Sequence, residues 1–436
     1  MSDHFTSLPI ELFESIVNTV QEEEETSPLY VSKAFLPLVR NKLFNTIKLY
    51  SSEDLNSFVQ LVRNSGAVGQ HVKHLEIDFI DDPDARETNW RARAREPTNE
   101  SLKPFFSCLN QVEQLEIKRS SRLAKFILTP STRDLLPSML ALKLDSTFEA
   151  WANPLDPQIF KSLSRYPNLG MLHLDIKRES KESIGVGNTL RFPPLRQITF
   201  LELQGPVCRN PAVFPFLSLF PNLHGFSTYD LTTPTHVSFA RPILERIPLP
   251  KQLVYLRVAS LRDYHSPEDI SPILRRFSNV KDLDIGMGVF NDKVFDLLNH
   301  ETFPSLESLT LRYEVSISDE QLLSLITGPR WLHKLKHLDL WLILENEGPP
   351  VFDLDSDEEE DDWAAGERYY RMLDASDWVE GPVGFKDKLT AKGLEQAVEA
   401  ADREGLEVTG YAAEFAREQI ESRKRNPSGL SDYEEM

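Results

Sequence analysis

Few residues in this sequence stand at the spacings that metal binding or catalysis requires. His71 and His74 have the His-x-x-His spacing of some zinc sites, but on or beside a strand that spacing turns the two rings to opposite faces. Asp353, Asp355 and Asp357 alternate like the start of a calcium-binding loop, yet the glycine and the closing glutamate of such a loop are both missing. We therefore expect no metal ion and no other cofactor.

Motifs for nucleotide binding and covalent catalysis are missing as well. Residues 286–288 read Gly-Met-Gly but lack the third glycine and the helix start of a phosphate-binding loop. No serine has the context of a nucleophile elbow. The two cysteines, Cys108 and Cys208, exclude a disulfide scaffold and a cysteine-based zinc cluster, and they indicate a reducing compartment. We therefore do not expect an enzyme. The alternative is an enzyme whose active site lies in the long loop near Trp90 or in the C-terminal segment.

The net charge of −20 is concentrated towards the C-terminus. Residues 353–436 hold 24 of the 68 acidic residues and 10 of the 48 basic ones, which leaves 44 acidic and 38 basic residues for positions 1–352. A broad basic face for nucleic acid is therefore not expected. No apolar run is long enough to span a membrane, and the first residues do not resemble a signal peptide. These features predict a cytoplasmic and/or nuclear protein with no nucleic-acid or membrane partner.

The elements that could position functional residues follow a repeat. Apolar residues at the first, fourth and sixth positions of a short pattern return roughly every 25 to 30 residues. The last two of them have the spacing of one face of a β-strand. One such strand cannot bury its apolar edge alone, whereas a stack of strands can. The pattern begins at Val72, Val112, Met139, Leu169, Ile198, Leu223, Leu253, Val280, Leu306 and Leu335.

Helices are expected between these strands. A helix should begin at Ser51, and Ser318 with Gln321 forms a capping box that should begin another. Turns such as residues 220–223 (Phe-Pro-Asn-Leu) precede several strands, and their proline ends the preceding helix. Strand, turn, helix and turn at this period resemble a leucine-rich repeat. We therefore predict an α/β solenoid of about ten repeats over residues 50–350, with a parallel sheet on its concave face and helices on its convex face.

The first 49 residues are predicted to form a small helical domain, because apolar residues recur there at helical spacing. Residues 8–12 (Leu-Pro-Ile-Glu-Leu), 31–35 (Val-Ser-Lys-Ala-Phe) and 43–47 (Leu-Phe-Asn-Thr-Ile) resemble an F-box, particularly the form common in fungal proteins. An F-box joined to leucine-rich repeats resembles the substrate receptors of SCF-type cullin–RING E3 ubiquitin ligases.

This resemblance implies a division of labour without covalent chemistry. The N-terminal domain would bind an adaptor of the Skp family and, through it, a cullin, while the repeats would hold a protein target. The chain would be a monomer within that complex. The alternative is a leucine-rich repeat interaction scaffold that is not linked to ubiquitin, in which the N-terminal helices only cap the solenoid. The residues implied in adaptor binding are Leu8, Pro9, Leu12, Ile16, Val31, Phe35, Leu38 and Phe44.

Residues 351–436 are predicted to form an acidic tail. Residues 353–362 carry eight acidic side chains in ten positions, a composition typical of a solvated, disordered segment. Short helices are expected within residues 389–425, where apolar residues return at helical spacing.

Strand alternation predicts which side chains line the concave face. Acidic residues outnumber basic ones there. This excess would suit a basic segment of a partner protein. Such charges also keep an exposed strand face soluble, so both interpretations stay open. Aromatic and arginine residues are the usual anchors of interfaces. The predicted target-binding residues are Glu76, Glu116, His173, Glu202, Tyr229, Arg257, Asp284, Arg312 and Trp341.

Overall fold

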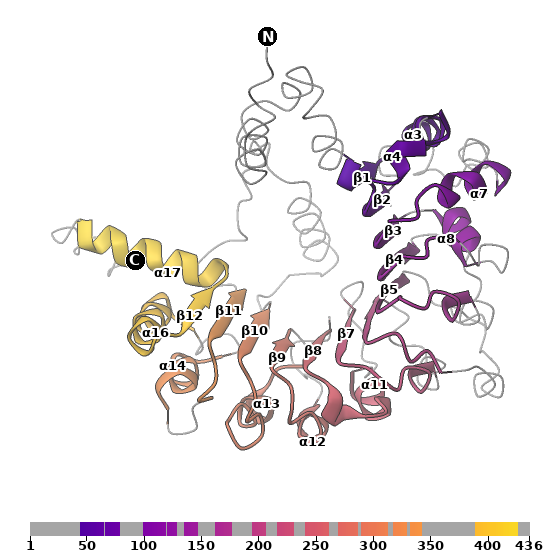
Figure 1. The fold of residues 1–436 in the computed structure, drawn as a ribbon. Coiled ribbons are helices and arrows are strands. Elements are labelled where there is room, and N and C mark those ends of the chain that lie inside the picture. Colours follow the sequence, from indigo (N-terminus) through magenta and orange to yellow (C-terminus); the bar gives the residue numbers. More distant parts are fainter. Residues whose placement is uncertain are drawn as a thin grey trace, which may run out of the picture. The chain divides into compact units, whose positions relative to one another are not determined.

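The computed structural model divides into two compact units (Figure 1). Unit 1 extends to Ile176 and includes residues 194–198, and unit 2 comprises the residues from Thr199 on. The structure describes residues 44–64, 66–78, 99–118, 120–128, 135–146, 162–176, 194–205, 216–230, 240–260, 269–286, 289–312, 317–328, 332–341 and 389–425.

Unit 1 contains five parallel strands, each paired with the next one along the chain. They are β1 (Thr46–Leu49), β2 (His74–Asp78), β3 (Gln114–Lys118), β4 (Ala141–Ser146) and β5 (Met171–Ile176). Helices lie along one side of these strands. They are α3 (Ser52–Asn64), α4 (Gly66–Gly69), α7 (Asn99–Ser107) and α8 (Ser121–Ile127).

Unit 2 repeats this arrangement with seven parallel strands in chain order. They are β6 (Phe200–Gln204), β7 (Gly225–Asp230), β8 (Tyr255–Ser260), β9 (Asp282–Ile285), β10 (Ser308–Arg312), β11 (His337–Trp341) and β12 (Glu407–Thr409). Its helices are α11 (Ala240–Arg246), the 3-10 helix η6 (Pro250–Gln252), α12 (Ser271–Leu274), α13 (Asp292–Phe295), α14 (Asp319–Thr327), α16 (Ala391–Glu404) and α17 (Tyr411–Arg425).

The ten strands expected from the apolar pattern are β2 to β11. Their register places equivalent apolar residues side by side, so that Leu309 pairs with Leu338 and Leu311 with Leu340. All four are at most 1% exposed. The pattern therefore predicts both the strands and the stack of buried leucine, isoleucine and valine rows that holds neighbouring repeats together.

The turns before the strands are joined to one another by backbone hydrogen bonds. The amides of Glu307 and Ser308 both donate to the carbonyl oxygen of Lys281, and the amides of Lys281 and Asp282 donate to that of Val254. The Asn279 side chain donates to the carbonyl oxygen of Lys251 at 2.8 Å. Asparagine recurs in these turns because its amide satisfies a carbonyl of the preceding repeat.

The helix starts expected from the sequence are confirmed. The Ser51 hydroxyl accepts from the Asp54 amide at 3.1 Å, and the Asp54 carboxylate accepts from the Ser51 amide at 3.1 Å. At α14, Ser318 and Gln321 form the same reciprocal capping box. None of the helices in the described ranges is long and apolar enough to cross a membrane.

Strand β1 corrects one part of the predicted N-terminal domain. Residues 46–49 were expected in the helical segment 1–49, but they pair in parallel with β2. Phe44, Ile47 and Leu49 have the apolar spacing of the repeat itself, and Ile47 and Leu49 lie opposite Leu75 and Ile77. The repeated sheet therefore begins before residue 50.

The C-terminal residues of unit 2 form a helix–strand–helix cap. The helices expected within residues 389–425 are α16 and α17, and between them β12 adds to the sheet beside β11. Both the amide and the hydroxyl of Thr390 donate to the carboxylate of Asp319, at 2.7 and 2.8 Å, which fixes the start of α16 on α14. The acidic residues 353–362 lie outside the described residues.

Candidate protein-binding surface

Alternate residues of the strands form the side of each sheet that carries no helices, which we call the strand face. Strand pairing sets these residues in rows across each unit. In unit 2, for example, Arg257 lies opposite Asp284, and Asp284 opposite Thr310. The predicted target-binding residues lie on this face. Three are in unit 1 (Glu76, Glu116 and His173), and six are in unit 2 (Glu202, Tyr229, Arg257, Asp284, Arg312 and Trp341).

On the strand face of unit 1, charged side chains neutralise one another. The Lys118 ammonium lies 2.7 Å from the Glu76 carboxylate, 3.3 Å from that of Glu116 and 3.9 Å from that of Asp78. Glu116 also contacts Lys143 at 3.4 Å. Burial alone would lower the pKa of Lys118, but the hydrogen bond to Glu76 and the charges of Glu116, Glu76 and Asp78 outweigh it and raise that pKa. Lys118 is therefore the cation that allows these carboxylates to sit together.

Replacing Lys118 with methionine is expected to lower the free energy of unfolding by about 2 kcal/mol, because three half-buried or buried carboxylates would lose their shared cation. Lys143→Met is the matched control, since Lys143 has one such contact at 3.4 Å, and its loss should stay below about 1 kcal/mol. Urea unfolding of the two variants checks this order. Equal losses would show that Lys118 has no special role.

In unit 2, one connected series of side chains crosses the strand face. It begins at β6, where Gln204 accepts a hydrogen bond of 2.6 Å from the Tyr229 hydroxyl of β7. The Arg257 guanidinium of β8 lies over the Tyr229 ring, 4.3 Å from its centroid. Arg257 also reaches Asp284 of β9, with its Nε 3.3 Å from a carboxylate oxygen. We call this set, with its continuation through β12, the cross-strand series.

The cross-strand series continues to the last strand. Arg312 Nε of β10 donates to Asp284 at 2.9 Å, and the Arg312 guanidinium lies 5.6 Å from the centroid of the Trp341 ring on β11. The Trp341 indole donates to Asp339 at 2.8 Å, and Asp339 also accepts from the Thr409 hydroxyl of β12 at 3.0 Å. The series thus joins four of the predicted target-binding residues through Asp284 or its neighbours. They are Tyr229, Arg257, Arg312 and Trp341.

Asp284 is the buried centre of the cross-strand series. It is 3% exposed, whereas the side chains of Arg257 and Arg312 are 20% and 25% exposed. Burial raises the pKa of Asp284, and Arg312 and Arg257 offset part of this effect. Two guanidiniums held by one carboxylate, each with an aromatic ring beside it, give the face side chains of fixed position.

A pair of aromatic rings also lies on this face. Phe200 of β6 and Tyr255 of β8 approach to 5.4 Å between ring centroids. Between them, β7 carries Gly225, where a Cβ atom would lie 2.3 Å from the Phe200 ring. Glycine is therefore required at this position because the ring of the neighbouring strand occupies the space of its side chain.

Tyr255 predicts a specific loss of stability in alkali. Burial, followed by the charge of Asp284, raises the pKa of Tyr255 to about 12. Because the folded state holds this proton more strongly than the unfolded chain, the contribution of Tyr255 is complete below its ordinary pKa of about 10 and is lost as the pH rises through about 12. Wild type should therefore lose up to about 2 kcal/mol more than Tyr255→Phe over this window. Urea unfolding at both ends of the window measures the difference, and parallel losses would contradict the prediction.

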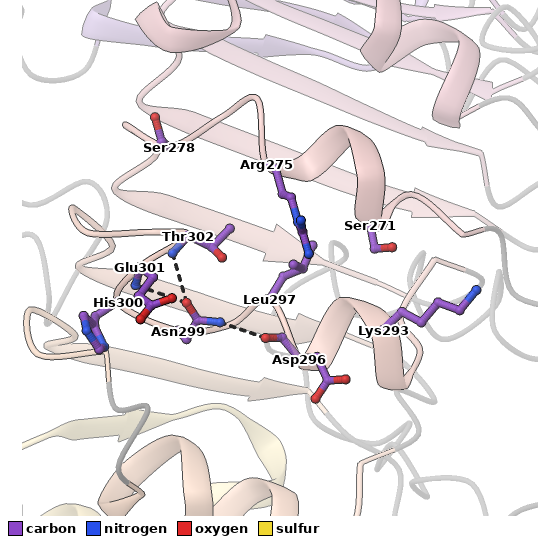
Figure 2. Close-up of a pocket in the computed structure, with 10 residues that line it drawn as sticks. All are labelled: Ser271, Arg275, Ser278, Lys293, Asp296, Leu297, Asn299, His300, Glu301 and Thr302. Carbon is purple, nitrogen blue, oxygen red and sulfur yellow. Dashed lines mark hydrogen bonds between the residues drawn. The ribbon is translucent and has the colours of Figure 1, made fainter.

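A hollow of about 880 Å³ opens on unit 2 around the start of α12 and the turn after α13 (Figure 2). The Asn299 side chain organises that turn, since its amide donates to the Asp296 carbonyl oxygen and its Oδ1 accepts from the amides of Glu301 and Thr302. The lining includes basic side chains such as Arg275 beside the acidic Asp296 and Glu301, and most of its surface is polar. Small-molecule sites are mostly apolar, so this hollow suits polar contact with a protein loop better than a cofactor.

One of the two candidate zinc ligands contacts the neighbouring strand. His74 Nδ1 lies 3.1 Å from the Gln114 side-chain oxygen on β3. Within the described ranges, no group of three or more histidine, cysteine, aspartate or glutamate side chains is placed to hold a metal ion. Asp353, Asp355 and Asp357 lie outside the described residues.

Of the residues implied in adaptor binding, the structure describes Phe44 alone. It is half-buried and lies two residues before β1, at the place that Val72 has before β2. The remaining seven lie outside the described residues. They are Leu8, Pro9, Leu12, Ile16, Val31, Phe35 and Leu38.

Sequence reasoning missed several residues of the strand face. Alternation places the first face position of each strand on this face as well, but the predicted target-binding set left it out; in β6, β8 and β9 this position holds Phe200, Tyr255 and Asp282. The same alternation that identified Arg257 would have identified Tyr255 two residues earlier. It also missed Glu407 and Thr409, because β12 was not expected.

Comparison with known protein families identifies the N-terminal part of the chain. Residues 5–82 match the family model described as the COS11 F-box domain. The match covers residues 8–12, 31–35 and 43–47 and continues through β1, α3 and β2 of unit 1. No curated protein matches the chain.

Proposed function

Because this chain is an F-box protein, we propose that it acts as the substrate-recognition subunit of an SCF-type cullin–RING E3 ubiquitin ligase. F-box domains generally bind adaptors of the Skp family. In this proposal the N-terminal residues bind such an adaptor, the adaptor binds a cullin, and the strand faces of the repeats bind a protein target. The chain itself catalyses nothing and works in the cytoplasm and/or the nucleus as a monomer within the complex.

The observation that carries the proposal is the F-box match, which runs directly into the repeated sheet. A receptor of this kind acts by holding its target at a high effective concentration and in a fixed orientation near the ubiquitin-charged enzyme. The F-box match includes β1 and β2, so the proposed adaptor-binding segment is continuous in sequence with the repeats. The connected side chains of unit 2 also support the proposal, since they form a surface of fixed geometry.

Hydrogen exchange of the full chain, with and without a purified Skp-family adaptor, tests this proposal. Residues that bind the adaptor must be accessible before it is added, whereas residues that only cap the first repeat would be buried on the sheet. We expect exchange within residues 5–44 to slow when the adaptor is added, while β6 to β11 stay unchanged. No slowing in a folded chain would favour the alternative, an interaction scaffold that is not linked to ubiquitin.

A further inference from the structure

We propose that the strand face of unit 2 binds a segment of the target that carries lysine or arginine, with Trp341 as the anchor of that contact. This inference rests on the proposed function, because it names the chemistry of the target that the repeats would hold. It concerns the end of the face formed by β9 to β12, which we call the Trp341 end and define by Asp282, Arg312, Asp339, Trp341 and Glu407.

The charges of this face favour a basic partner. Its strands carry five carboxylates at face positions (Glu202, Asp282, Asp284, Asp339 and Glu407) and two guanidiniums (Arg257 and Arg312). Arg257 and Arg312 both contact Asp284, Arg257 also lies 4.0 Å from Glu202, and the charge of Arg312 acts on Asp282 as well. Two guanidiniums therefore face five carboxylates. An excess of negative charge on one face attracts a positively charged segment and hastens its association.

The carboxylates of the Trp341 end have mostly uncharged partners. Asp339 accepts hydrogen bonds from the Trp341 indole and the Thr409 hydroxyl, and neither donor carries a charge. Glu407 contacts His337 at 2.8 Å, which is an ion pair only when His337 is protonated. The Glu407 side chain is 61% exposed. Cationic side chains of a partner could therefore approach carboxylates that are not already neutralised by lysine or arginine.

Trp341 has the properties of an interface anchor. It is 44% exposed. The other large apolar residues that are exposed in the described ranges are leucines and a valine. The orientation of Trp341 is fixed from two sides, by the hydrogen bond to Asp339 and by the Arg312 guanidinium over the ring. A ring that is held in place loses little conformational entropy on binding, and an indole also attracts a cation to its face.

Among the described residues of unit 1, the strand face offers no comparable place. There Lys118 and Lys143 neutralise the central carboxylates, and the large exposed apolar residues of unit 1 are Leu61 of α3 and Leu140 of a turn. The hollow beside α12 mixes Arg275 with acidic residues and gives no charge preference. The Trp341 end therefore combines two features that these other described surfaces lack, an excess of carboxylates and a fixed exposed aromatic ring.

Fluorescence anisotropy of labelled short peptides with the full chain tests the inference. One peptide carries lysine and arginine among small residues, a second replaces them with glutamate, and a third with glutamine. We expect the basic peptide to bind about tenfold more tightly than either of the others, and added salt to weaken it. Trp341→Ala should weaken it about tenfold, and Trp341→Phe by less. Leu249→Ala, which removes a 47% exposed apolar side chain away from the strand face, should leave binding unchanged.

The same preparations are tested for binding of a Skp-family adaptor, so that the two proposals can fail separately. Equal or tighter binding of the glutamate or glutamine peptide would overturn the inference, as would absence of binding by the basic peptide. Unchanged affinity in Trp341→Ala would overturn the role of the anchor. If the basic peptide binds and the adaptor does not, the inference about this surface stands and the ligase assignment is overturned. Circular dichroism of each variant shows that a loss of binding is not a loss of fold.

Discussion

Asp284→Ala should lower the free energy of unfolding by about 2 to 3 kcal/mol, because it leaves two mostly buried guanidiniums without a carboxylate. The change also removes the central member of the cross-strand series, so that Tyr229 and Trp341 are no longer connected through the arginines. Chemical unfolding followed by circular dichroism measures the loss. A loss of a few tenths of a kcal/mol would mean that the series contributes nothing to the sheet.

Asp284→Asn separates the role of the hydrogen bond from that of the charge. Burial raises the pKa of Asp284 despite Arg312 and Arg257, so the ionised form has a net desolvation cost in the fold. A neutral side chain of the same shape that still accepts from Arg312 should therefore cost less than about 1 kcal/mol. If the asparagine variant is as unstable as the alanine variant, the charge and not the hydrogen bond holds the series together.

Gly410→Ala should be the most damaging single change in the C-terminal cap. Gly410 has a φ of +91°, and a Cβ atom there would lie 2.6 Å from the Leu340 carbonyl oxygen and 2.8 Å from the Asp339 carboxylate. Backbone strain and overlap with β11 together should destabilise the cap by about 3 kcal/mol. We expect amide hydrogen exchange to rise through β12 and α17, because α17 begins at the next residue.

Gly405→Ala is the matched control for this change. Gly405 also has a positive φ, of +72°, but no atom lies within 4 Å of the place a Cβ would take. Alanine at this position should therefore lower the free energy of unfolding only through backbone strain, by about 1 kcal/mol. It should leave β12 paired with β11. Similar exchange profiles for the two variants would show that contact with Leu340 and Asp339 is not what makes Gly410 necessary.

The repeat could be predicted from sequence because its apolar spacing is the physical cause of the stacking. Leu338 and Leu340 are buried since their strand lies between two others with the same spacing. Strand β1 could have been found in the same way, from Phe44, Ile47 and Leu49. It was missed because these residues also belong to the segment that resembles an F-box.

Strand β12 could not be predicted from that spacing. Of the three apolar positions of the pattern, β12 keeps only Val408, which lies opposite Leu338. Gly405 and Gly410 stand at the other two. This strand is held instead by α16 and α17, and by contacts between residues about 70 positions apart, such as that of Thr390 with Asp319. Contacts of that range leave no local signal in the sequence.

For the candidate surface, alternation along the strands predicted which side chains share a face, but not their partners. Glu76 and Glu116 were counted as charges available to a target, and the structure shows both bound to Lys118. The order of strands decides this, because Lys118 meets Glu76 only through the pairing of β2 with β3. A count of charges along one chain therefore overestimates what the surface offers to a partner.

Direct binding of a purified Skp-family adaptor to the full chain tests the proposed function most closely. The chain is compared by calorimetric titration with a variant that carries Pro9→Ala, Leu12→Asp and Ile16→Asp, and with Leu249→Asp, which places a charge at an exposed residue far from the F-box in sequence. We expect one adaptor per chain for wild type and Leu249→Asp, and no binding by the triple variant despite an unchanged unfolding curve. A folded wild-type chain that does not bind the adaptor would contradict the assignment as a ligase receptor.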